Sequence, residues 1–181
     1  MAKHLMVDLE TLAVSPNAVV LSLGAVHFNP YGNGYGDKIY MRIDIDDQDK
    51  MNREIDPNTI DWWAKQNPKV VEEAFNPEDR IPLAEAIDRF HKFAWGCDAF
   101  WSHGSIFDLV ILENIYRQLG KPLPWKFWQI RDTRTIFDLG LNPDMPKDNL
   151  HDALQDAIRQ SVGVQNVYRK LREHRISKDK I

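Results

Sequence analysis

The sequence has little of what several classes of protein require. Cys97 is the only cysteine among 181 residues, which excludes an internal disulfide and any metal site made of cysteine alone. No apolar run approaches the roughly 20 residues of a transmembrane helix. The first residues, MAKHLMVDLE, lack the apolar core and cleavage site of a signal peptide. We therefore expect a cytoplasmic protein with no membrane partner.

The chain also lacks a net positive charge. The net charge is −4, which does not predict a broad nucleic-acid-binding surface. The exception is the segment 169–181, RKLREHRISKDKI, with six Lys or Arg residues against two acids. This segment is either a solvated helix end or a basic arm that contacts phosphates.

The remaining composition is that of an ordinary globular protein. Hydrophobic residues make up 43% of the chain and charged residues 28%. Neither a repeat, nor a low-complexity segment, nor a linker divides it. We therefore expect a single domain over residues 1–181, with the basic segment as the end of its last helix.

Residue patterns predict the order of helices and strands. Apolar, β-branched and alternating stretches indicate strands over 4–12, 17–29, 38–46, 98–103 and 126–130. Helical spacing, caps and terminators indicate helices over 56–68, 82–95, 106–120, 132–140 and 150–174, with a loop over 141–149. Asn33-Gly34 favours a hairpin turn; a phosphate-binding loop is disfavoured because no lysine or helix start follows. The order predicts an α/β fold with a mixed five-stranded sheet flanked by helices.

Two acids close the first predicted strand. Asp8 and Glu10 are two positions apart, so they point to the same face, opposite Leu5, Val7 and Leu9. Two carboxylates this near to each other on a half-buried surface repel each other and lose solvation. A bound cation or access to water has to compensate for this cost.

Two further acids are expected near the same edge of the sheet. Asp108 lies in the first turn of the helix after the fourth strand, and Asp156 lies early in the last helix. Each also has a simpler explanation, Asp108 as a helix N-terminal acid and Asp156 as a surface residue. Taken together, the four carboxylates suit two Mg²⁺ ions about 4 Å apart, which promote phosphoryl transfer.

His151 precedes Asp156 by five residues. On a regular helix their side chains would diverge by about 140°, so both face one site only if His151 lies in the entering loop or first turn. A histidine there suits proton removal from water. Two alternatives remain open: an exposed histidine at a helix start, and a rival carboxylate pair of Asp152 and Asp156.

Three motifs carry a family resemblance. VDLET, HGSIFDLVIL and HDALQDA, in that order, resemble the DEDD superfamily of 3′–5′ exonucleases, histidine subgroup, which includes ribonuclease T and polymerase proofreading domains. The resemblance covers residues 5 to about 165 and implies a ribonuclease-H-like fold. The small size, with LSLGAV and TIDWWAKQ, is similar to the Rv2179c-like branch of bacterial and phage exoribonucleases, and allows a homodimer.

The resemblance implies roles for individual residues. Asp8, Glu10, Asp108 and Asp156 would bind two Mg²⁺ ions, for which Mn²⁺ can substitute, and His151 would be the general base. Thr11 would lie near the terminal 3′-hydroxyl. Many members continue with Thr-Gly where this chain has TLAVSPNAVV, which leaves the shape of the 3′-end pocket open.

Aromatic residues near these motifs are candidates for base stacking. Trp62, Trp63 and Phe107 suit unpaired bases, although one tryptophan must face the core if its segment is helical. We select Phe107, beside Asp108, and Trp63.

The leading hypothesis is a metal-dependent 3′–5′ exonuclease that releases nucleoside 5′-monophosphates from RNA, or from single-stranded DNA and 3′ overhangs. RNA is favoured by the branch resemblance alone. The alternatives are a ribonuclease-H-like endonuclease and a non-catalytic nucleic-acid-binding module.

Overall fold

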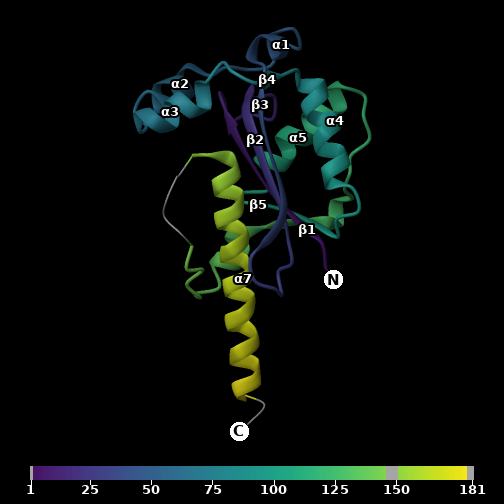
Figure 1. Cartoon of the computed structure of the whole chain (residues 1–181), viewed down its shortest axis with the longest axis vertical. Helices are drawn as coiled ribbons and strands as arrows, with labels where there is room; N and C mark the ends of the chain where they lie inside the picture. The colour runs from purple at the N-terminus through teal and green to yellow at the C-terminus, as the bar shows by residue number, and fades with distance from the viewer. Residues whose placement is uncertain (1, 146–150, 179–181) are drawn as a thin grey trace.

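The computed structural model describes residues 2–145 and 151–178, and they form one mixed sheet between layers of helices (Figure 1). The sheet has the strand order β4-β3-β2-β1-β5-β6. Its strands are β1 (His4–Thr11), β2 (Val20–Phe28), β3 (Tyr35–Ile43), β4 (Arg80–Ile81), β5 (Ala99–Ser102) and β6 (Ile130–Asp132). The predicted α/β class and mixed sheet are confirmed. The sheet has six strands rather than five, because Arg80–Ile81 pairs in parallel with the end of β3.

Strand β1 is central, and both of its faces are covered. It pairs antiparallel with β2 and parallel with β5. Leu5, Val7 and Leu9 pack into the larger core cluster, whereas Met6 packs into a second cluster on the other face. Asp8 follows Met6 on that second face, so the predicted alternation is confirmed.

Different helices cover the two faces. Helices α4 (Leu83–Ala94) and α5 (Asp108–Gln118) contribute to the larger cluster, and α7 (Ala153–Lys178) packs across the opposite face (Figure 1). The shorter helices are α1 (Ile45–Asp49), α2 (Pro57–Trp63), α3 (Pro68–Phe75) and α6 (Thr133–Phe137). Helix α2 begins as predicted, with Asp56 as its cap.

A glycine brings α7 against the sheet. A Cβ atom on Gly24 of β2 would lie 2.2 Å from the backbone nitrogen of Leu154 and 2.3 Å from the carbonyl carbon of Ala153. No side chain fits in that space, so the first turn of α7 rests directly on the β2 backbone. Gly24 pairs with Asp8 across the β1–β2 ladder. The start of α7 therefore lies next to the acidic end of β1.

Three segments differ from the sequence prediction. The strand expected over 38–46 ends at Ile43, because Asp44 caps α1 by accepting the N–H of Asp47. Helix α3 was not predicted. The strand expected over 126–130 is a 3-10 turn, Phe127–Gln129, followed by β6, because the Gln129 N–H closes the turn on the Lys126 carbonyl. Residues 146–149 of the expected loop 141–149, and residue 150 of the expected helix 150–174, lie outside the described residues.

The described side chains of the basic segment have partners within the protein. Arg169 donates to Asn33 and Asn166, Lys170 pairs with Asp144, and Arg172 donates to the Tyr31 carbonyl. Side chains from residue 174 onward lie outside the description, so a phosphate-binding arm stays a prediction. Within the described ranges, no helix combines the length and the apolar character needed to cross a membrane.

Candidate active site

Strand β1 delivers two acids to the face that α7 covers. Asp8 is half-buried, and Glu10 is buried with 7% of its surface exposed. Gln160 of α7 donates its amide N–H to Asp8 Oδ1 at 2.9 Å. This bond ties the strand acid to the helix that lies over it.

Asp108 is the first residue of α5 and is almost fully buried. Its Oδ1 accepts the backbone N–H of Leu9 at 3.0 Å. The parallel pairing of β1 with β5 ends at Met6 and Trp101, so Asp108 provides a partner for β1 just beyond the end of the ladder. Asp108 thus holds the backbone of Leu9, which lines the cavity described below, but Asp108 itself is not part of that lining.

Asp156 organises the start of α7. Its Oδ2 accepts the backbone N–H of His151 at 2.9 Å, and its Oδ1 accepts Arg159 Nε at 3.0 Å and Nη2 at 2.5 Å. His151 adopts φ of +66° just before the helix, in the left-handed region of backbone conformation. This is the entering-loop position that the five-residue spacing requires.

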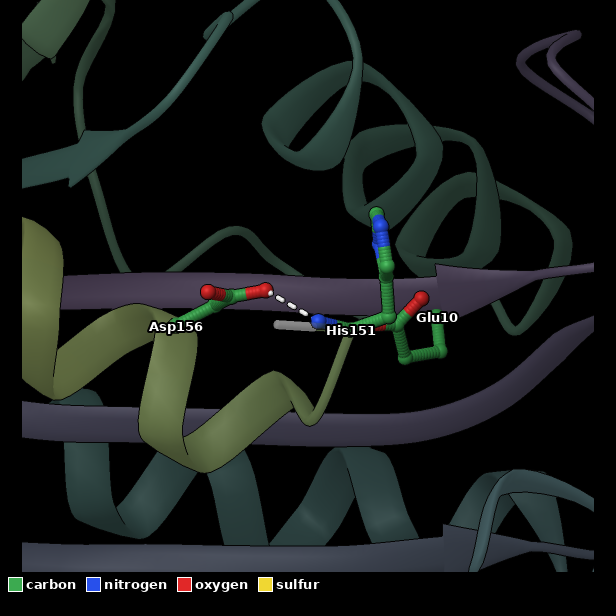
Figure 2. A group of neighbouring side chains, drawn as sticks. All are labelled: Glu10, His151 and Asp156. Atoms are coloured by element: carbon green, nitrogen blue, oxygen red, sulfur yellow. Dashed lines mark hydrogen bonds between the residues drawn. The ribbon is translucent and has the colours of Figure 1, made fainter. Parts of the chain in front are cut away.

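Figure 2 shows Glu10, His151 and Asp156 arriving from strand β1 and from the start of α7. A potential ligand atom of each lies within 4.8 Å of the others. Asp152 is not part of this group, and its Oδ1 caps α7 by accepting the Gln155 N–H. Glu10, His151 and Asp156 therefore come together, and Asp8 lines the same cavity, whereas Asp108 belongs to neither set. That all five form one catalytic site stays a prediction.

Burial and mutual repulsion keep protons on these carboxyls. Burial raises the pKa of Glu10 to about 8, and the charges of Asp156 and Asp108 add to this effect. Burial also raises the pKa of Asp108 to about 7, although the Leu9 N–H opposes the rise. The pKa of Asp8 is likewise raised well above its ordinary range, by burial and by Asp108. The site has more carboxylates than nearby positive charge can balance.

Asp8, Glu10 and Asp156 border a cavity of about 600 Å³. Trp62 lines this cavity and is 41% exposed. Its ring meets the His151 ring edge-on, with centroids 4.9 Å apart. Trp63 is 2% exposed, and its indole N–H donates to the Thr11 carbonyl. Phe107 also lines the cavity, whereas the Thr11 hydroxyl donates to the Ala13 carbonyl. One tryptophan thus faces the cavity and its neighbour anchors the wall.

Comparison with family models decides the assignment. Residues 3–168 match the 3′-5′ exoribonuclease Rv2179c-like domain. The chain belongs to this family. The resemblance to the DEDD exonucleases is therefore confirmed, and with it the Rv2179c-like branch. No curated protein sequence matches the chain.

Solved structures share the fold of this Rv2179c-like chain at low sequence identity. Zinc-bound E. coli exonuclease I with single-stranded DNA matches with a TM-score of 0.70 and 15% identity, over 96% of this chain and 42% of that one. Exonuclease I from Methylocaldum szegediense gives 0.63 and 18%, over 94% and 41%. Cell-death related nuclease 4 (CRN-4) gives 0.66 and 15%, over 94% and 64%. The ribonuclease-H-like fold is confirmed, and the chain spans less than half the length of exonuclease I.

The acidic site of this Rv2179c-like chain fits the divalent metal ions that an exonuclease family implies. Its donors are carboxylate oxygens and an imidazole, which suit hard or borderline cations. The amide oxygen of Gln160 is buried beside Asp8 and has no hydrogen-bond partner among the described residues. A cation, or a water molecule near it, would satisfy both the repelling acids and this oxygen.

Several residues of the cavity were not predicted from the sequence, including Arg159, Gln160, His103 and Arg134. Arg159 and Gln160 follow Asp156 by three and four positions, a spacing that places them on its helix face and that could have identified them. His103 and Arg134 also line the cavity, but they come from separate segments with no shared spacing. Only the folded chain brings this second pair together.

Proposed function

We propose that the protein is a metal-dependent 3′–5′ exonuclease that acts on single-stranded 3′ ends, with RNA as the favoured substrate. The convergence of Glu10, Asp156 and His151 at one cavity carries the proposal. Water attacks the phosphorus of the last phosphodiester, and the bond from that phosphorus to the 3′-oxygen of the preceding nucleotide breaks. The products are a nucleoside 5′-monophosphate and a shortened strand with a new 3′-hydroxyl.

Asp8, Glu10, Asp108 and Asp156 would hold two Mg²⁺ ions, with Mn²⁺ as a substitute. Bound in this way, the ions would supply positive charge that favours ionisation of water and stabilises the leaving oxygen. Gln160 orients Asp8 from α7, and the Leu9 N–H orients Asp108. Arg159 holds one oxygen of Asp156, so this carboxylate has a fixed direction before substrate arrives.

His151 would be the general base. Its backbone N–H is bound to Asp156, and its ring packs edge-on against Trp62. Both contacts limit where the imidazole can point. The ring has a nitrogen within 4.8 Å of the carboxylate oxygens of Glu10 and Asp156, so it is placed to take a proton from water held at this site.

The terminal nucleotide would occupy the 600 Å³ cavity. Phe107 and Trp62 would provide the stacking surface, because Trp62 is 41% exposed, whereas the predicted Trp63 is buried and supports the wall instead. The main chain at Thr11 would lie near the 3′-hydroxyl. Its carbonyl is held by Trp63, so the buried tryptophan would position the residue that meets the strand end.

The proposal is tested with a 5′-labelled RNA and a DNA strand of the same sequence, each incubated with protein and Mg²⁺. A ladder that shortens from the 3′ end is expected, faster for RNA. Asp8→Asn should abolish the ladder, whereas Asp46→Asn, an exposed acid on α1, should not. An absence of cleavage, or cleavage that survives Asp8→Asn, would refute the proposal.

A circular strand separates this proposal from an endonuclease. An exonuclease leaves the circle intact, whereas a ribonuclease-H-like endonuclease acting on its RNA–DNA hybrid opens it. Tight binding of the linear strand without turnover, in both Mg²⁺ and Mn²⁺, would instead indicate a binding module.

A further inference from the structure

Arg134 stands where two cavities meet. With His103, it lines both the catalytic cavity and a neighbouring cavity of about 620 Å³. The second cavity is otherwise lined by Thr135, Phe137, Asp138 and Leu139. Because the two cavities share two side chains, a strand whose last nucleotide occupies the first can continue past Arg134 into the second.

The backbone around Gly104 fixes the place of this arginine. A Cβ atom on Gly104 would lie 3.1 Å from Arg134 Nη1, so the guanidinium lies over the glycine. Gly104 has φ of +106°, a conformation that favours glycine. Asp132 accepts the N–H groups of Ser105 and Arg134, which joins the loop after β5 to the start of α6. Arg134 is thus held beside the site by local backbone geometry.

The two arginines at the catalytic cavity differ in their partners. Arg159 is paired with Asp156 at 2.5 Å. The guanidinium of Arg134 is exposed and has no hydrogen-bond or ion-pair partner in the described part of the chain. A guanidinium suits a phosphate group, which it can bind through two parallel N–H groups. Among the described residues of this acidic site, Arg134 therefore has an unpaired positive charge that can bind a phosphate.

We infer that Arg134 binds the phosphate on the 5′ side of the penultimate nucleotide, and that the second cavity receives that nucleotide. This inference rests on the proposed function, because it assumes that the 3′-terminal nucleotide occupies the catalytic cavity. Its direct consequence concerns the smallest good substrate. That substrate carries a phosphate on the 5′ side of its penultimate nucleotide, in addition to the phosphodiester that is cleaved.

Two dinucleotides that differ by this one phosphate provide the test. pUpU carries the 5′-phosphate and UpU lacks it, while the bond to be cleaved is the same. The wild-type protein with Mg²⁺ should have a kcat/KM for pUpU about 10-fold higher or more, as expected for a charge-assisted contact. Arg134→Gln should reduce this ratio to near one, because pUpU loses a contact that UpU does not make.

Arg117→Gln is the matched control, because Arg117 is exposed near the C-terminal end of α5, whereas Asp108 begins that helix. It should keep the wild-type ratio. The inference is overturned if Arg134→Gln also keeps the ratio, or if it slows both dinucleotides equally. Equal slowing would place the arginine on the cleaved phosphate or in the folding of the site.

Binding without catalysis separates this inference from the proposed function. In EDTA, the affinity for a fluorescent oligonucleotide should fall in Arg134→Gln, with a salt slope shallower by about one. If this occurs but the wild-type protein cleaves no strand in Mg²⁺, the exonuclease proposal fails and the phosphate contact stands. If affinity and slope are unchanged, the contact is refuted, whatever the activity.

Discussion

Strand β1 and helix α7 hold their acids in different ways. Asp8 and Glu10 belong to a strand paired on both sides, and burial raises the pKa of each. Asp156 sits at a helix start, where both of its oxygens already accept N–H groups. The strand half is therefore fixed in position but electrostatically unsatisfied. The helix half is satisfied, and its position depends on how closely α7 approaches the sheet.

The largest expected effect comes from removing one charge from each half. Asp8→Asn and Asp156→Asn should each lower kcat/KM for an RNA strand by more than about 100-fold, because even groups behind the ligands change activity 10–100-fold. Their stabilities should differ in EDTA. Asp8→Asn removes a repelling carboxyl and should keep or raise the melting temperature, whereas Asp156→Asn loses acceptors for Arg159 and His151 and should lower it. Equal shifts in thermal unfolding would contradict the comparison.

Gly24→Ala tests the approach of α7. The added methyl group would meet backbone atoms of Ala153 and Leu154, so α7 must move, with a stability cost of about 1–3 kcal/mol. Movement of α7 carries Asp156 and His151 away from Glu10, so activity should fall as well. Gly36→Ala on β3 is the matched control, because its nearest contact would be an ordinary 3.6 Å. Chemical denaturation and RNA cleavage measure both effects; a Gly24→Ala protein with wild-type activity would show that the close approach is unnecessary.

Trp62→Ala removes the stacking face without touching the acids. Binding of an RNA strand should weaken about 10-fold, since stacking on an aromatic side chain contributes about 1–3 kcal/mol per base. Trp95→Ala removes another exposed tryptophan, at the end of α4, and should leave affinity unchanged. Fluorescence anisotropy in EDTA provides the measurement. Unchanged binding by Trp62→Ala would assign the cavity wall to Trp63 and Phe107 alone.

The last expected effect is the pH dependence of the metal-free protein. Glu10 has a pKa of about 8 when folded and 4.5 ordinarily, so between these values the folded state keeps a proton that the unfolded state has lost. The free energy of unfolding should therefore fall as pH rises from 5 to 8. The melting temperature should fall with it, by about 2–4 °C for each 1 kcal/mol of stability lost. Glu10→Gln should flatten this decline. A melting temperature in EDTA that rises over this range would contradict the repulsion assigned to the strand half.

The same contrast explains what the sequence could predict. Alternation in HLMVDLETL is enough to place Asp8 and Glu10 on one face, because a strand has a period of two. The position of Asp108 follows from the helix that it begins. His151 and Asp156 were identified as site residues by the family resemblance of their motif. Their five-residue spacing predicted that His151 lies in the loop that enters the helix.

The rest depends on contacts between distant segments. No local pattern shows that Gly24 would lie under Leu154, or that Gly104 would lie under Arg134. The roles of Trp62 and Trp63 were interchangeable in the sequence, since a short helix has no fixed rotation until it packs. In the structure, the bond from the Trp63 indole to the Thr11 carbonyl decides the rotation and leaves Trp62 facing the cavity.

The account depends above all on one pair of ions held by acids from both halves. Crystals soaked in Mn²⁺ and measured near the manganese absorption edge locate such ions directly. The account predicts two anomalous peaks about 4 Å apart, bounded by Asp8, Glu10, Asp108 and Asp156. A map with manganese elsewhere, or with none between β1 and the start of α7, would contradict it.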